Sequence, residues 1–206
     1  MDRRTTIKWV LAASAAWPLR GIRVAQADTP PAVAQGYGTD PGLLKVYKPG
    51  ELWPLTLSAP QRRLAGVLAD LIIPADEHSP SASSVGVVDF IDEWVSAPYP
   101  DFQRDRPIVL DGFVWLDAEA ARRSGKAFAD LETTQRQTIC DDICDESRAA
   151  PERRTAAHFF AVYRDLTAGG FYSTPVGRKD LGYIGNVPLT SFAGPPPELL
   201  RKLNLA

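Results

Sequence analysis

Apolar residues recur at helical spacing in several separate stretches of the chain. In the first stretch, Ser58 and Gln61 match the Ser-x-x-Gln capping box that starts many helices. The apolar residues between Leu64 and Ile72 then recur three or four positions apart, so they share one face of a helix. Pro74 predicts the end of this helix, because the residue before a proline avoids the helical conformation.

A second helix is predicted to start near Val85. Its apolar stripe runs from Val88 to Val95, and Asp92 is among the acidic residues on the opposite face. Two prolines, Pro98 and Pro100, are expected to stop this helix, because a proline lacks the backbone N–H that the helix interior needs.

Three more helices are predicted further along the chain. Asp105-Arg106-Pro107 is expected to open the third, with the aspartate as cap and the proline in the first turn, and Gly125 to close it. The fourth is predicted from about Thr133 to Glu146 and the fifth from about Pro151 to Ala168, where Gly169-Gly170 signals a helix end. The residues of the fifth helix expected to face inward are Ala156, Phe159, Phe160, Tyr163 and Leu166. The sequence therefore predicts an all-α fold, a small irregular bundle of about five helices.

The segments at either end of this bundle follow no helical period. Residues 28–57 are rich in proline and glycine yet contain several large apolar side chains, so we expect an extended arm that lies on the domain or on a partner. The tail that begins at Phe171 is rich in turn residues and aromatic rings. The predicted organisation is an export signal at 1–27, the arm at 28–57 and a helical domain at 58–206.

The first 27 residues have the three-part layout of an export signal. Arg3 and Arg4 are adjacent, Lys8 and an apolar run follow, and Ala25 and Ala27 form a small-x-small cleavage site. The paired arginines favour the twin-arginine route, which carries proteins that are already folded. A mitochondrial presequence and a lone membrane anchor are the alternatives, although the apolar run is far shorter than the roughly 20 residues that a span needs.

Charge and cysteine content exclude some functions. Residues 1–27 hold five of the 23 basic and one of the 25 acidic residues, so the remainder has a net charge of −6 and is a poor nucleic-acid binder. Cys140 and Cys144 are four positions apart, which suits a disulfide within one helix poorly. No C-x-x-C-H motif is present for c-type haem. We therefore expect two buried thiols in a helix.

One loop carries candidate chemistry. Asp76, Glu77 and His78 are consecutive, and with His158 of the fifth helix they could bind a metal ion or act as a general base. The alternative is a solvated turn in which Asp76 or Ser79 bonds backbone groups at the helix end. The sequence has no G-x-G-x-x-G after a strand, no P-loop and no G-x-S-x-G elbow. It therefore offers no motif for a cofactor bound by this chain.

Three segments of the chain are distinctive as motifs. They are "LADLIIPADEHSPSASSVGVVDFIDEWVSAPYP", "FFAVYRDLTAGGFYSTPVGRKDLGYIGNVPL" and "GPPPELL". With the twin-arginine start and the spacing between them, they cover nearly the whole chain after residue 27. The combination of "IIPAD…SPSA", "GGFYSTP" and "LGYIGN" is specific, and through it the chain resembles the gluconate 2-dehydrogenase subunit 3 family.

The resemblance implies the small, or gamma, subunit of a membrane-bound flavin dehydrogenase complex. The large subunit of such complexes is a glucose–methanol–choline (GMC)-type oxidoreductase that carries FAD and oxidises a sugar, sugar acid or polyol. A c-type cytochrome subunit with haem c often takes the electrons. A small subunit with a twin-arginine signal escorts the large one through the twin-arginine translocase. The family pattern gives no catalytic, cofactor-binding or metal-binding residue to transfer to this chain.

Two hypotheses remain open. The first is a non-catalytic periplasmic subunit, held at the inner membrane through its complex, that exports, assembles and stabilises the FAD-bearing large subunit. The second is a self-sufficient periplasmic metal-dependent enzyme or electron carrier that uses the loop Asp76-Glu77-His78. Under the first, arm and tail residues are expected to contact the large subunit, although such rings also pack on a chain's own core. These residues are Leu43, Leu44, Tyr47, Trp53, Phe171, Tyr172, Tyr183 and Phe192.

Overall fold

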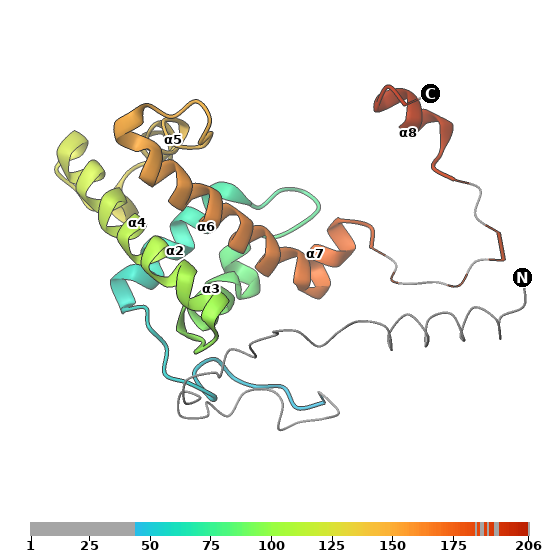
Figure 1. Ribbon diagram of the computed structural model, residues 1–206, viewed down its shortest axis with the longest axis horizontal. Helices are drawn as coiled ribbons and strands as arrows, with labels where there is room; N and C mark the ends of the chain where they lie inside the picture. The colour runs from blue at the N-terminus through green and yellow to red at the C-terminus, as the bar shows by residue number, and fades with distance from the viewer. Residues whose placement is uncertain (1–43, 184, 186–187, 189, 192–193, 206) are drawn as a thin grey trace, which may run out of the picture. The chain divides into compact units, whose positions relative to one another are not determined.

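Helices are the only regular secondary structure in the described part of the chain. The computed structural model describes residues 44–183, 185, 188, 190–191 and 194–205, which belong to the unit Asp40–Ala206. The α-helices are α2 (Ala59–Ile72), α3 (Val87–Ser96), α4 (Pro100–Ser124), α5 (Thr133–Asp141), α6 (Arg154–Ser173), α7 (Pro175–Asp180) and α8 (Pro197–Lys202) (Figure 1). Three short 3-10 helices are η2 (Ala82–Val85), η3 (Phe128–Asp130) and η4 (Pro151–Arg153). The described residues contain no strand, which confirms the predicted all-α fold.

The core forms where α6 packs against α2, α3 and α4 (Figure 1). The Phe113 ring of α4 meets the rings of Phe159 and Tyr163 on α6, with centroid distances of 6.0 and 5.6 Å. The fully buried Tyr163 donates its hydroxyl hydrogen to the carbonyl of Ala65 on α2 at 2.8 Å. This bond satisfies the one polar atom of a buried ring and links α6 to α2. The five α6 residues predicted to face inward are all buried, as expected.

The first helix begins where the sequence predicts. The backbone N–H of Ser58 donates to Oε1 of Gln61 at 2.9 Å, which is one half of the capping box. Near the other end of α2, Asp70 holds the following 3-10 helix. Its two carboxylate oxygens accept hydrogen bonds from the backbone N–H and the hydroxyl of Ser83, at 2.8 and 2.7 Å. The loop between α2 and η2 is therefore tied back to α2.

Helix α4 starts earlier than predicted. It begins at Pro100 and contains Pro107 in its interior, so the predicted start at Asp105 was wrong. Pro100 lies in the first turn, where the missing N–H of a proline needs no partner. Asp105 instead accepts a hydrogen bond from the indole nitrogen of Trp94 at 2.8 Å. The helix ends at Gly125 as predicted, in the left-handed conformation with φ of 67°.

The predicted limits of the last two long helices were also inexact. Helix α5 ends before Glu146, and Pro151 begins η4 rather than α6. Helix α6 continues through Gly169-Gly170, so the expectation that these glycines end it was wrong. A Cβ at Gly170 would lie 2.8 Å from the ring of Phe90 on α3. This glycine therefore allows α3 and α6 to pack closely.

Candidate functional site

The loop Asp76-Glu77-His78 forms a hydrogen-bonded turn. Oδ1 of Asp76 accepts the backbone N–H groups of His78 and Ser79, both at 2.8 Å. The bond from His78, and after it the bond from Ser79, lowers the pKa of the Asp76 carboxyl. The side chains of Glu77 and His78 are largely exposed and lie 3.3 Å apart, from Oε1 to Nε2. The loop is thus a solvated turn, as in the second interpretation, but Asp76 accepts N–H groups of the turn itself rather than bonding groups at the end of α2.

The second histidine does not join this loop in a metal site. His158 lies on the exposed side of α6, with Nδ1 3.5 Å from Oε1 of Glu146. Within the ranges that the structure describes, no group of three or more His, Cys, Asp or Glu side chains could hold a metal ion. The hypothesis of a metal-dependent enzyme therefore finds no ligand set in this part of the chain.

The two cysteines have different environments. Cys140 lies near the end of α5 and is buried, and this burial raises the pKa of its thiol to about 12. Cys144 lies beyond the end of α5 at Asp141 and is exposed. The expectation of two buried thiols in a helix holds for Cys140 and was wrong for Cys144, because α5 ends at Asp141.

A buried carboxylate fixes the extended arm to α3. Asp92 has no exposed side-chain surface, and its Oδ1 accepts the backbone N–H groups of Thr56 and Leu57, both at 3.0 Å. Its Oδ2 accepts a hydrogen bond from Arg62 at 2.7 Å, and the hydroxyl of Ser96 donates to Oδ1 at 3.3 Å. A buried charge is tolerated where such partners surround it. We define the arm anchor as Thr56, Leu57, Arg62, Asp92, Ser96 and Arg106.

Helix α4 completes the arm anchor. Nη2 of Arg106 donates to the carbonyl of Ser96 at 3.1 Å and to Oγ1 of Thr56 at 3.2 Å. Just before these residues in the chain, Trp53 is 8% exposed and lies edge-on to Tyr99, with ring centroids 5.9 Å apart. This part of the arm lies on the domain, which is one of the two positions predicted for it.

Two of the rings predicted to contact a large subunit are in the chain's own interior. Phe171 has no exposed surface, and its ring lies edge-on to Tyr172 with centroids 5.2 Å apart. Trp53 is also buried. At these two positions the alternative interpretation holds, in which the ring packs on its own core.

Other predicted contact residues are accessible. Tyr172 is 38% exposed, Tyr183 is 55% exposed, and Leu44 is 88% exposed, whereas Tyr47 is half-buried. Their contact with a partner stays a prediction. The predicted residues outside the described part of the chain are Leu43, Phe192 and, in the export signal, Arg3, Arg4, Lys8, Ala25 and Ala27.

The motif Gly-Gly-Phe-Tyr-Ser-Thr-Pro builds a tight corner between α6 and α7. Thr174 caps α7, because its Oγ1 accepts the backbone N–H of Gly177 at 3.0 Å. The same hydroxyl donates to the carbonyl of Phe171 at 2.7 Å. A Cβ at Gly177 would lie 2.1 Å from that carbonyl oxygen, so the turn requires glycine. We call residues 171–183 and 185 the α6–α7 corner.

The far side of the corner closes in a Schellman motif. Gly182 has a φ of 69°, and its N–H donates to the carbonyl of Lys179 at 3.0 Å. The N–H of Tyr183 donates to the carbonyl of Arg178 at 2.9 Å, which completes the pattern. An open hollow of about 440 Å³ results, and its lining residues are Pro175, Arg178, Lys179, Tyr183 and Gly185.

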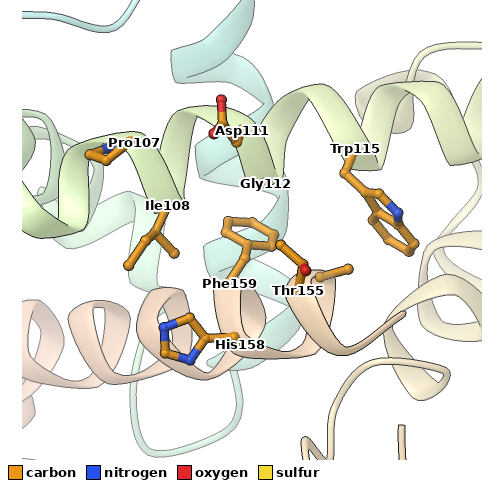
Figure 2. A pocket seen from close by; sticks show the side chains of 9 residues that line it. Pro107, Ile108, Asp111, Gly112, Trp115, Thr155, His158 and Phe159 are labelled. Carbon is orange, nitrogen blue, oxygen red and sulfur yellow. The ribbon is translucent and has the colours of Figure 1, made fainter. Parts of the chain in front are cut away.

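A second hollow, of about 280 Å³, lies between α4 and α6. Figure 2 shows Ile108, Trp115 and Phe159 around it, whereas Asp111 points away from α6. The Phe159 ring lies against Gly112, where a Cβ would be 2.0 Å from the ring. The mostly apolar lining can hold an apolar group, and the absence of a side chain at Gly112 is what lets α6 approach α4.

The comparisons with known proteins agree with the motifs that build this fold. Residues 59–190 match the family described as Gluconate 2-dehydrogenase subunit 3. The chain belongs to this family. No curated protein and no solved structure matches the chain. The match extends from the start of α2 to beyond the α6–α7 corner, so it contains the buried carboxylate of the arm anchor as well.

Membership of the gluconate 2-dehydrogenase subunit 3 family makes the chain a small subunit of a dehydrogenase complex. Among the helices of the described residues, none is long and apolar enough to pass through a membrane. The exposed side of the α6–α7 corner and the outer part of the arm are the candidate contact surfaces.

Proposed function

We propose that this subunit 3 chain is a non-catalytic small subunit of a periplasmic flavin-dependent dehydrogenase complex. It is needed for export, assembly and stability of a GMC-type large subunit that oxidises a sugar, sugar acid or polyol. Family membership over residues 59–190 is the observation that carries this proposal. The paired arginines at positions 3 and 4 support the export part of it.

The arm anchor supplies a physical reason for coupling export to folding. The backbone N–H groups of Thr56 and Leu57 reach Asp92 only after α3 has packed beside the start of α2. The end of the arm, at Thr56 and Leu57, is therefore held by the folded domain rather than by local sequence. Such an arrangement suits a route that carries folded cargo.

The proposal places the redox chemistry in other chains. FAD belongs to the large subunit, and haem c belongs to a cytochrome subunit where the complex has one. The twin-arginine translocase is the transient partner, and the periplasmic side of the inner membrane is the final location. This chain contributes a binding surface and the signal.

A pull-down from the native host tests this function. The chain carries a C-terminal tag, and the isolated material is examined by visible absorption and mass spectrometry. We expect a yellow complex with a flavoprotein, and a colourless small subunit after the two are separated. A chain that is isolated alone, with bound metal and its own oxidoreductase activity, would contradict the proposal.

A further inference from the structure

Both cysteines of the chain open onto the same hollow. Cys140 and Cys144 line a space of about 340 Å³, and the end of α2 and parts of α5 and α6 form its other walls. Cys140 is 5% exposed, whereas Cys144 is an exposed residue. The sequence contains two cysteines in all, so within one chain each thiol has the other as its single possible disulfide partner.

The end of α5 removes the geometric obstacle to a bond between them. A spacing of four residues suits a disulfide poorly while both residues are on one helix, because their side chains then run parallel. Helix α5 ends at Asp141, and the N–H of Ile143 donates to the carbonyl of Cys140 at 3.0 Å, three residues back rather than four. Sγ of Cys144 lies 3.4 Å from the carbonyl oxygen of Asp141, so this thiol points back toward the helix end. Cys144 is therefore free of the helical geometry that disfavours a disulfide.

We propose that Cys140 and Cys144 form an intramolecular disulfide in an oxidising compartment. The oxidant is an accessible disulfide, either of another protein or of glutathione. The thiolate of Cys144 attacks one sulfur of that disulfide and releases the other as a thiol, which leaves a mixed disulfide on Cys144. The thiolate of Cys140 then attacks Sγ of Cys144 and releases the second thiol. The chain loses two hydrogens and two electrons, and the oxidant gains them.

The different environments of the two thiols set the order of these steps. Cys144 reacts first, because it is exposed. Cys140 reacts second and slowly, because burial raises the pKa of its thiol to about 12 and few of these thiols are ionised at neutral pH. A short thiol titration of the reduced chain therefore detects Cys144 alone. The shared hollow leaves room for the Cys144 side chain to turn toward Cys140 while the fold stays closed.

The inference rests on the proposed function for the compartment in which the bond forms. A chain that folds in the cytoplasm keeps its thiols reduced, and it meets disulfide oxidants after export to the periplasm. The bond would then tie the last turn of α5 to the segment that follows it. The reaction itself needs neither the large subunit nor the translocase, so it can be tested apart from both.

Oxidation by glutathione disulfide tests this inference. The full chain is purified in its reduced form, incubated with an excess of glutathione disulfide and then separated from it. Intact mass spectrometry of acid-quenched samples follows the glutathione adduct over time, and a non-reducing gel detects linked chains. Cys140→Ser is the matched control, because it keeps the exposed thiol and lacks the second one. Cys140→Ala replaces it if circular dichroism shows that the serine variant does not fold.

The wild-type adduct should disappear at least about tenfold faster than the adduct of the control, since a neighbouring thiol in the same chain has a high effective concentration. Its product should be a monomer that is two hydrogens lighter than the reduced chain and carries no glutathione. A wild-type adduct as persistent as that of the control would overturn the inference. Chains linked to one another through Cys144, in place of the lighter monomer, would also overturn it. Neither of these results would affect the proposed function.

Discussion

The carboxylate of Asp92 accepts a hydrogen bond from the backbone N–H of Leu57 at 3.0 Å, although the two residues are 35 positions apart. Asp92 has no exposed side-chain surface, so water cannot replace this bond. The contact joins the end of the extended arm to the middle of α3. It is the structural basis for treating the end of the arm as part of the folded subunit.

Replacement of Asp92 by alanine should destabilise the domain by about 3 kcal/mol. The change removes the acceptor of the Leu57 N–H and one of the two acceptors of the Thr56 N–H and of the Arg62 guanidinium, and unsatisfied buried groups are costly. Urea unfolding followed by circular dichroism measures the loss. Asp89→Ala is the matched control, because Asp89 also pairs with Arg62 but its side chain is 46% exposed. It should cost less than about 1 kcal/mol, and equal losses for the two variants would contradict this account.

Gly112→Ala should lower the free energy of unfolding by about 2 kcal/mol. The added Cβ would lie 2.0 Å from the Phe159 ring, so α4 and α6 must move apart. Gly169→Ala on α6 provides the control, since no atom lies within 4 Å of its added Cβ. We expect that variant to gain up to about 1 kcal/mol, because alanine favours a helix more than glycine does. Thermal unfolding measures the stability of both variants. A Gly112→Ala variant more stable than the wild type would show that α4 and α6 leave room for a Cβ at this position.

Glu119 should make stability depend on pH in the acid range. Hydrogen bonds from Arg122 and then Arg123 lower the pKa of its carboxyl from the ordinary 4.5 to about 2. A group with a lowered folded-state pKa stabilises the protein fully above its unfolded value, so this contribution is complete above about pH 4.5 and is lost as the pH falls toward 2. We expect about 1 kcal/mol, because solvent screens the exposed Arg122. Glu119→Gln should lose less stability than the wild type between pH 5 and 2, and parallel curves would refute the assignment.

One thiol per native chain should react with Ellman's reagent. Cys144 is exposed, whereas burial raises the pKa of Cys140 to about 12 and keeps it protonated and inaccessible. Denaturation in guanidinium should release the second thiol. Cys144→Ser should remove the fast reaction and leave the slow one, and two fast thiols in the native wild type would mean that the end of α5 is open.

Local signals in the sequence predicted the elements that depend on neighbouring residues. The Ser58–Gln61 capping box and the inward face of α6 are of this kind, because their partners lie within a few residues or on one helix face. Pro107 and Gly170 gave misleading signals. Their effect on a helix depends on what packs beside them, and for Gly170 that neighbour is the Phe90 ring of another helix.

The arm anchor could not be predicted from the sequence either, because its contacts join residues that are far apart in the chain. Asp92 lies on the polar side of its predicted helix, and nothing in the spacing shows that Thr56 and Leu57 come to lie against it. The α6–α7 corner was partly accessible, since its glycines and threonine are recognisable turn residues.

If this chain provides the export signal for the large subunit, the localisation of the large subunit must depend on Arg3 and Arg4. Arg3→Lys with Arg4→Lys is introduced into the native host, and Arg20→Lys with Arg23→Lys is the matched control within the same 27 residues. Periplasmic and cytoplasmic fractions are then probed for this chain and for the flavoprotein. The first variant should keep both proteins in the cytoplasm, and the control should export both. A flavoprotein that still reaches the periplasm beside the Arg3→Lys, Arg4→Lys chain would show that this subunit does not provide its export.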